Sequence, residues 1–120
     1  MSGGYFDYWQ YHIDRIADDV EHVIGKNNTE RDVEDIERWM RDEDGNVREE
    51  YKYYNGYSDN SIELMKQGVW FLKVAAMYAQ RIDYLLSSDD GEESFKRRTE
   101  KEFDELMKQI PESLIDVLKK

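Results

Sequence analysis

Two groups of residues have spacings that suggest a metal site, and the first lies near the start of the chain. Asp18 and Asp19 precede His22 by four and three residues. A carboxylate three residues before a histidine is one part of the di-iron site of helical bundles. That site also needs glutamates and a second such pair on other helices, but the chain has two histidines in total. We therefore expect His22 to be an ordinary surface residue.

The second group is the run Asp42-Glu43-Asp44-Gly45-Asn46, which has the composition of a calcium-binding loop. In an EF-hand loop the glycine is the sixth residue, and the first and twelfth residues supply acidic ligands. With Gly45 in sixth place, those positions fall on Met40 and Tyr51, which carry no carboxylate. We interpret the run as a solvated turn and expect no metal cofactor.

The sequence contains no recognisable catalytic motif. It has no Gly-x-Ser-x-Gly turn, no glycine-rich phosphate loop and no kinase or nuclease signature. Cysteine is absent, which excludes a thiol nucleophile, a thiolate metal site and a disulfide framework within this sequence. We therefore predict a protein that is not an enzyme and has no cofactor.

The net charge of −11 limits the partners that the chain can bind. Such a field repels nucleic acid, so a direct nucleic-acid role is not expected. It suits docking onto a basic protein, a class that includes nucleic-acid-binding proteins. Residues 30–50 contain ten acids and four arginines, more than half of the net charge. The alternative is that these charges only solvate the chain. The predicted partner-binding residues are Glu34, Asp35, Asp42, Glu43, Asp44, Glu49, Glu50, Tyr51 and Tyr54.

Five aromatic residues crowd the first eleven positions. Trp9 continues an apolar stripe that runs through the following helix, so we expect Trp9 in the core. The other aromatics cannot all share that side, because adjacent helical residues point about 100° apart. We predict that they form a ligand site or a subunit interface. The predicted residues of this site are Tyr5, Phe6, Tyr8, Tyr11, Arg81, Asp89 and Asp90.

Arg81 has two interpretations that the sequence leaves open. It either pairs with Asp89, Asp90 or Glu92 and fixes the corner between two helices, or it faces an anionic ligand. The second interpretation is aided by the free backbone amides at the start of the next helix.

Hydrophobic periodicity predicts helices throughout the chain. One helix is expected over 6–24 and is ended by Gly25, and a short one follows, capped by Thr29. The strongest pattern predicts a long helix over 59–87, capped by Ser58 or Asn60. In that helix Gly68, Ala75, Ala76 and Ala79 would let a neighbouring helix approach closely.

The remaining segments complete the expected architecture. Residues 47–57 fit either a helix or an extended piece, with Asn55-Gly56 as a possible hairpin turn. A further helix follows the turn at 87–93, and Pro111 starts a last short one. The predicted fold class is all-α: a small helical bundle of three main antiparallel helices plus short helices, in a single domain over 1–120.

A resemblance to other proteins is carried by two stretches, MSGGYFDYWQYHIDRIADDVE at the start and YAQRIDYLLSSDDGEESF at 78–95. Their Gly-Gly-x-Phe-x-Tyr and Arg-Ile-Asp…Asp-Asp-Gly-Glu-Glu-Ser-Phe segments resemble those of a group of small uncharacterised proteins from bacteria, phages and prophages, many of gut origin. The resemblance covers about a third of the chain and excludes the acidic block. It implies a small phage-type cytosolic protein with an accessory or counter-defence role.

Three functional hypotheses follow. The first is a non-enzymatic, phage-type inhibitor that occupies a host defence protein through its acidic block. The second is an oligomeric sponge that sequesters a nucleotide-like signalling ligand, and the third is a structural or accessory subunit. A homo-oligomer is expected in each case. No apolar run is long enough for a membrane span and the start lacks the pattern of a signal peptide, so we expect a cytoplasmic protein of the host cell.

Overall fold

The computed structural model describes residues 4–54 and 56–120, and within them it is helical with no named strand. This confirms the predicted fold class, an all-α protein whose helices pack on one another. The α-helices are α1 (Gln10–Lys26), α2 (Asp59–Leu86), α3 (Glu92–Met107) and α4 (Glu112–Leu118). Three short 3-10 turns, η1 (Val33–Asp35), η2 (Arg38–Met40) and η3 (Glu49–Tyr51), lie between α1 and α2.

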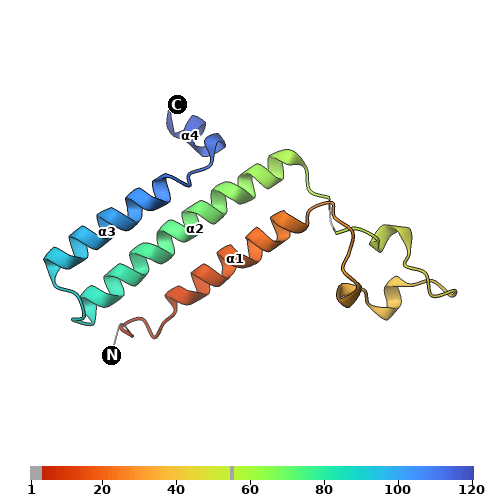
Figure 1. Cartoon of the computed structure of the whole chain (residues 1–120), viewed down its shortest axis with the longest axis horizontal. Coiled ribbons are helices and arrows are strands. Elements are labelled where there is room, and N and C mark those ends of the chain that lie inside the picture. The colour runs from red at the N-terminus through yellow and green to blue at the C-terminus, as the bar shows by residue number, and fades with distance from the viewer. Residues whose placement is uncertain (1–3, 55) are drawn as a thin grey trace.

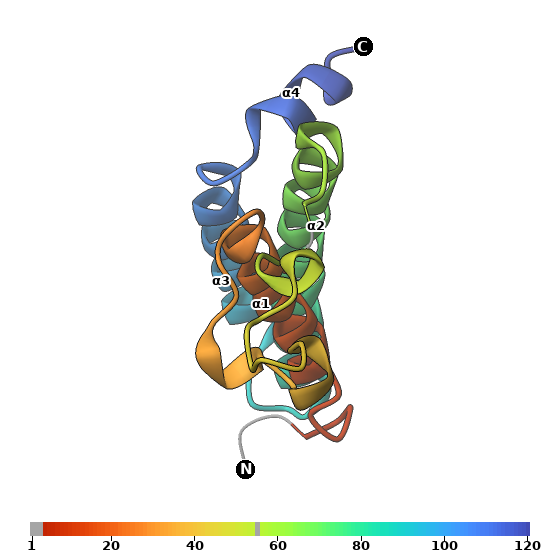
Figure 2. The ribbon, with the colours of Figure 1, turned by 90° about the vertical axis from the view of Figure 1, so that its right-hand side faces the viewer.

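The three long helices lie side by side and antiparallel, with α2 in the middle (Figure 1). Both α1 and α3 pack on α2 and make little contact with each other. The molecule is elongated, with extents of 65 × 40 × 16 Å and a radius of gyration of 19.8 Å. A compact chain of this length would have a radius of gyration of about 14 Å. The helices therefore form one layer rather than a closed bundle (Figures 1 and 2).

The helix boundaries follow from local interactions. Ser58 caps α2 as predicted, since its hydroxyl accepts a hydrogen bond from the Ser61 amide at 3.3 Å. The first helix begins at Gln10 rather than residue 6, because Asp7 and Tyr8 have φ of 54° and 62°, which an α-helix does not allow. It also continues one residue past Gly25 and ends at Lys26.

The core of the layer is small and centred on α2. Val69, Trp70 and Ala76 are buried there, together with Ala17 of α1. The Trp70 indole Nε1 donates a hydrogen bond to the Leu106 carbonyl at 2.8 Å, which joins α2 to α3.

The prediction that Trp9 lies in the core was wrong, because its side chain is 67% exposed. Trp9 directly precedes α1 and belongs to the turn of residues 4–9 that leads into this helix. Its ring lies against that of His12, with 5.2 Å between the ring centroids, instead of packing into the contact between α1 and α2.

The segment 27–58, which we call the arm, projects beyond the ends of α1 and α2 (Figure 1). The α-helix expected after Thr29 was wrong, since two 3-10 turns replace it. The Thr29 hydroxyl donates to the Lys26 carbonyl at 2.7 Å and so helps to close α1 instead of starting a helix.

The two halves of the arm pair loosely with each other. The Arg31 amide donates to the Lys52 carbonyl at 2.7 Å, and the Tyr54 amide donates to the Thr29 carbonyl at 2.9 Å. Isolated antiparallel bridges join Glu30 to Tyr53 and Arg41 to Val47. Residues 47–54 therefore contain the 3-10 turn η3 between two bridge residues, Val47 and Tyr53, and Asn55 of the expected turn lies outside the described residues.

Candidate functional site

The most complete polar cluster lies where the start of the chain meets the end of α2. The Asp83 side chain is completely buried and accepts four hydrogen bonds. Oδ1 accepts from the Tyr5 amide at 2.7 Å and from the Ser87 hydroxyl at 3.1 Å. Oδ2 accepts from the Gly4 amide at 3.1 Å and from Gln10 Nε2 at 2.6 Å. The cluster binds the N-terminal turn to the middle helix.

These contacts determine the charge state of Asp83. Burial on its own raises the pKa of this carboxyl, because it disfavours the charged form. The hydrogen bonds from Gln10, Gly4, Tyr5 and Ser87 together outweigh burial, so the pKa of Asp83 lies below its usual value. An ionised carboxylate whose acceptor sites are occupied by the chain's own donors is a structural anchor and offers no free atom to a substrate.

Arg81 lies near this corner and is surrounded by the chain's own groups. Its guanidinium lies 3.5 Å from an Asp90 carboxylate oxygen and 3.5 Å from one of Glu102, and it stacks 4.7 Å from the Tyr84 ring centre. Asp90 also binds Arg98 at 3.2 Å. The arrangement matches the interpretation of Arg81 as a corner-fixing residue, with Asp90 as its partner.

The residues predicted for a ligand or subunit interface lie at one end of the layer but differ in exposure. Tyr5, Tyr8 and Tyr11 are exposed around the start of α1, and Tyr8 and Tyr11 stack with 6.0 Å between their ring centroids. Arg81 and Asp90 are buried in the corner, while Asp89 is exposed in the turn that follows α2. Phe6 is half-buried beside Ile13 and Ala79.

The base of the arm is fastened to the end of α1 by a second polar cluster. Lys26 Nζ lies 2.6 Å from Asp32 Oδ2. The Tyr54 hydroxyl donates to Asp35 and accepts from the Asp32 amide at 3.1 Å. The hydrogen bond between Lys26 and Asp32 raises the pKa of Lys26 and lowers the pKa of Asp32. The hydrogen bond that Tyr54 donates to Asp35 raises the pKa of Tyr54. The arm therefore leaves the helices in a defined direction.

The tip of the arm is a tight turn at residues 42–46. Asp42 Oδ1 accepts from the Asp44 amide at 2.9 Å and from the Asn46 amide at 3.0 Å. Gly45 has a φ of +85°, which a residue with a side chain would adopt only with strain. Arg41 donates to the Gly45 carbonyl at 2.8 Å. The turn thus presents Glu43 and Asp44 to solvent.

Most of the arm's acids face solvent, while two of its arginines are used internally. Arg31 donates to the Tyr51 carbonyl at 2.9 Å and stacks on Tyr54, and Arg41 holds the tip. The arm also exposes apolar side chains, including Trp39 at 60%. Of the predicted partner-binding residues, Glu34, Asp35, Asp42, Glu43, Asp44, Glu49 and Glu50 are exposed, and Tyr51 and Tyr54 are half-buried.

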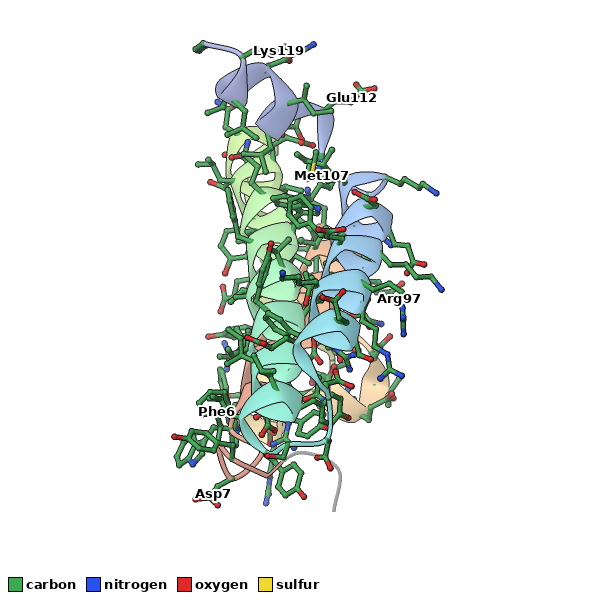
Figure 3. All side chains as sticks on the ribbon, turned by 90° about the vertical axis from the view of Figure 1, so that its left-hand side faces the viewer. Phe6, Asp7, Arg97, Met107, Glu112 and Lys119 are labelled. Atoms are coloured by element: carbon green, nitrogen blue, oxygen red, sulfur yellow. The ribbon has the colours of Figure 1, made fainter. Side chains whose placement is uncertain are left out.

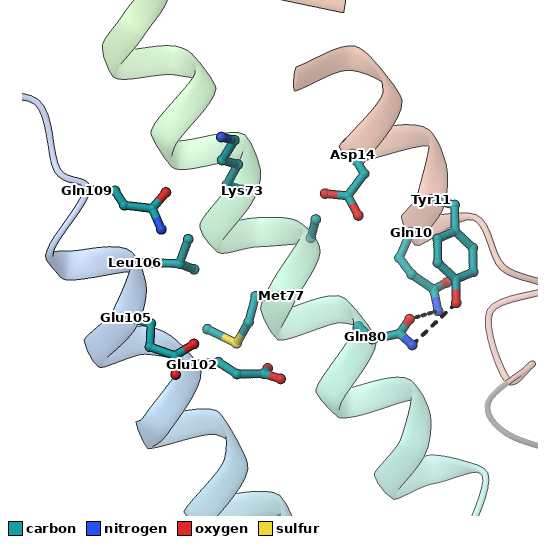
Figure 4. A pocket seen from close by; sticks show the side chains of 11 residues that line it. Gln10, Tyr11, Asp14, Lys73, Met77, Gln80, Glu102, Glu105, Leu106 and Gln109 are labelled. Atoms are coloured by element: carbon teal, nitrogen blue, oxygen red, sulfur yellow. Dashed lines mark hydrogen bonds between the residues drawn. The ribbon is translucent and has the colours of Figure 1, made fainter. Parts of the chain in front are cut away.

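A groove runs along α2 between α1 and α3. One cavity of about 460 Å³ is lined by residues of all three helices, with Gln10 and Gln80 joined by a 2.7 Å hydrogen bond (Figure 4). A second cavity of about 470 Å³ continues it past Lys73 toward Trp70. The lining of the first cavity contains the carboxylates of Asp14, Glu102 and Glu105 and one cation, Lys73, which does not favour an anionic ligand.

Sequence reasoning missed Asp83 and Gln10 as the centre of the corner. The only available signal was a carboxylate in the mostly apolar run from Val69 to Leu86, which also contains Lys73, Gln80 and Arg81. That signal identifies a buried acid and does not identify its partners, because those come from residues about 75 positions earlier in the chain.

Comparisons with known proteins give no match: no family model, no curated protein and no solved structure is similar to the chain. Over residues 4–54 and 56–120 there is no group of three or more His, Asp or Glu side chains placed to share a metal ion. Every helix in that part of the chain is too short or too polar to cross a bilayer.

Proposed function

We propose that the protein is a non-enzymatic binding protein that inhibits a basic partner protein by docking the arm on it. The observation that carries this proposal is the arm itself, a projecting segment that is fastened at its base and carries exposed acids and an exposed tryptophan. Helix packing does not require such a segment, because the arm makes few contacts with the helices beyond its base.

The distribution of charge supports a basic partner. Ten acids and four arginines lie in residues 30–50, and Arg31 and Arg41 are directed to backbone carbonyls within the arm. Both arginines keep their positive charge, so the block has a net charge of −6, more than half of the −11 of the chain. Complementary charge speeds encounter between proteins and selects against wrong partners, and its effect weakens with salt.

The apolar residues of the arm support a specific contact rather than mere solvation. Trp39 lies edge-on to Tyr51, with 5.0 Å between the ring centroids, and is 60% exposed. Tryptophan is among the residues that contribute most to binding when a partner covers them. An arm that only solvated the protein would have no need of an exposed tryptophan.

The resemblance to small phage and prophage proteins supplies the context in which such an inhibitor would act, on a host defence protein. The alternative of a nucleotide-like sponge has less support. It relied on Arg81, which is neutralised by Asp90 and Glu102, and the cavity between the three helices has three acids and one lysine in its lining.

The test is capture of a partner from bacterial lysate, followed by titration of the purified partner against variants of the chain. The quadruple variant Glu34→Lys, Glu43→Lys, Asp44→Lys and Glu50→Lys should lose binding. Trp39→Ala should weaken binding by at least tenfold, since such an anchor contributes about 1.4 kcal/mol or more. Binding by the unaltered chain should weaken as salt rises.

The matched control reverses four exposed acids on the helices: Asp18, Asp19, Glu100 and Asp116. It changes the net charge by the same amount and should keep the affinity of the unaltered chain. Equal affinity of the arm variant and the control would show that the arm is not the docking site and would overturn the proposal.

A further inference from the structure

The side of α2 that faces away from the groove is apolar and uncovered. Its residues follow one another at steps of four and three, the spacing of a helix-packing seam. Leu64 and Phe71 are 66% and 50% exposed, and Tyr78 and Leu86 are also exposed. Figure 3 shows no further helix over the side chains that project from α2 on the left of the layer. The residues of this seam are Leu64, Gly68, Phe71, Ala75, Tyr78, Ile82 and Leu86.

This side of α2 carries no charge. The charged residues of α2, all of which the structure describes, are Asp59, Glu63, Lys66, Lys73, Arg81 and Asp83. At about 100° per residue, all of them lie more than about 90° from the line through Leu64 and Phe71. Such an absence of charge is unexpected on a solvated surface, because 38% of the residues in the chain are charged.

The small residues of the seam have no function within the chain. A Cβ atom added to Gly68 would meet no atom within 4 Å, and Ala75 is exposed. Small residues on an open helix side allow a second helix to approach closely.

The neighbouring side of α1 continues the same surface. Trp9, Ile16 and Val23 are exposed at steps of seven, with Ile13 and Val20 half-buried between them. We call the two seams together the open face. Most charged residues of α1 lie elsewhere around the helix, whereas Asp19 borders this seam beside Ile16 and Val23.

We infer that the open face is the surface on which a second copy of this chain packs, with α1 on α1 and α2 on α2 in antiparallel orientation. A helical domain normally has two packed layers, and this chain supplies one. The inference is independent of the proposed function, because the open face and the arm share no residue.

The charges on α3 select the antiparallel orientation. The side of α3 opposite its groove-lining residues carries Lys96, Glu100 and Asp104, all exposed. If two copies faced each other with parallel helices, the apolar side of α1 would cover this charged side of α3. In the antiparallel arrangement it covers the apolar side of the second α1.

The two seams also share one midpoint, as a twofold axis requires. Gln10 of α1 binds Gln80 and Asp83 of α2. Because the helices are antiparallel, Ile16 lies level with the stretch 74–77 of α2. Ile16 is the middle of the seam on α1, and Ala75 is the middle of the seam on α2. An axis through Ala75 places Gly68 opposite Ile82 and Phe71 opposite Ala79, so these large side chains meet small ones, while Leu64 lies opposite Leu86.

The exposed area is sufficient for a stable dimer. The chain exposes 8923 Å², whereas a compact monomer of this mass would expose roughly 6,900 Å². The excess is about 2,000 Å², part of which belongs to the arm. A standard interface buries about 800 Å² on each partner, so half of the excess already meets that requirement.

The first test is the mass of the purified chain against concentration, by native mass spectrometry or light scattering. We expect twice 14.5 kDa for the unaltered chain. Phe71→Glu should raise the dissociation constant of the dimer by about 100-fold, because each dimer loses two buried aromatic side chains. The matched control Leu118→Glu alters an exposed leucine on α4 and should leave the dimer intact. Circular dichroism checks that both variants keep their helices.

The second test uses the absence of cysteine, which makes any single-cysteine variant unambiguous. Under oxidation Ala75→Cys should form a disulfide-linked dimer, whereas Lys101→Cys, on the exposed side of α3, should not. A chain that stays monomeric at 100 μM, or that dimerises equally well with Phe71→Glu, would overturn the inference and leave the open face to a different protein. Equal cross-linking of both cysteine variants would overturn the proposed arrangement.

Discussion

Asp83→Asn is the substitution whose effect the structure defines best. The two carboxylate oxygens of Asp83 each accept two hydrogen bonds, from Tyr5 and Ser87 on one and from Gly4 and Gln10 on the other. Asparagine keeps one oxygen and replaces the other with an amide that donates. Whichever way the new side chain turns, one backbone amide, that of Tyr5 or of Gly4, loses its acceptor and faces another donor in a completely buried site, because only the Ser87 hydroxyl and the Gln10 side chain can turn to accept.

The expected loss follows from that contact. A hydrogen bond to a charged group contributes about 1.5–3 kcal/mol, so losing one of them costs about 1.5 kcal/mol or more. A local change costs less free energy than unfolding of the whole chain: the N-terminal turn at residues 4–9 detaches while the helices stay packed. The loss then appears as faster exchange of the Gly4 and Tyr5 amides rather than as lower resistance to urea.

The assay therefore combines two measurements. Urea unfolding followed by circular dichroism gives the free energy of unfolding, and hydrogen exchange reports on the amides of Gly4 and Tyr5. Asp104→Asn, the same chemical change at an exposed site on α3, is the control and should stay within about 0.5 kcal/mol of the unaltered chain. The reasoning is refuted if Asp83→Asn matches this control in both measurements.

Two further predictions concern the same corner. The stabilisation from Asp83 should be complete above the ordinary carboxyl pKa of 3.8 and should be lost as the pH falls below it, through the lower pKa of the folded state. The protection of the Gly4 and Tyr5 amides, measured by hydrogen exchange, should therefore become equal in the unaltered chain and Asp83→Asn only in acid. Arg81→Ala should lower the free energy of unfolding by about 3 kcal/mol, because Asp90 and Glu102 lose a buried cation. Arg98→Ala removes a half-exposed arginine and should lower it by less than about 1 kcal/mol. Equal losses in urea unfolding would contradict the assignment of Arg81 as the corner-fixing residue.

The features that the sequence predicted well are those that depend on neighbouring residues. The long helix over 59–87 was found almost to the residue as Asp59–Leu86, because its apolar repeat is long and Ser58 provides a cap. The short helix at the end follows Pro111 as expected. The helix expected after Thr29 does not form, because the Thr29 hydroxyl donates to the Lys26 carbonyl instead of capping a new helix. The residue type allows both hydrogen bonds and does not decide between them.

The features that the sequence did not predict depend on which side of a helix is covered. Trp9 continues the apolar stripe of α1, and periodicity places such a residue in a core whenever a second layer exists. This chain forms one layer of helices, so part of the apolar stripe of α1 remains exposed although the stripe itself was identified correctly. For α2 one apolar seam was recognised and a second, through Leu64 and Phe71, was not, because a helix that is apolar on two sides gives a blurred period.

The elongated outline of the molecule affects how it moves in solution. A radius of gyration of 19.8 Å is what a globular protein of roughly 300 residues would have. The chain should therefore diffuse and sediment more slowly than its mass of 14.5 kDa suggests, with a frictional ratio well above that of a sphere. Gel filtration against globular standards would assign a single copy the mass of an assembly, so copy number in this protein has to be taken from absolute mass.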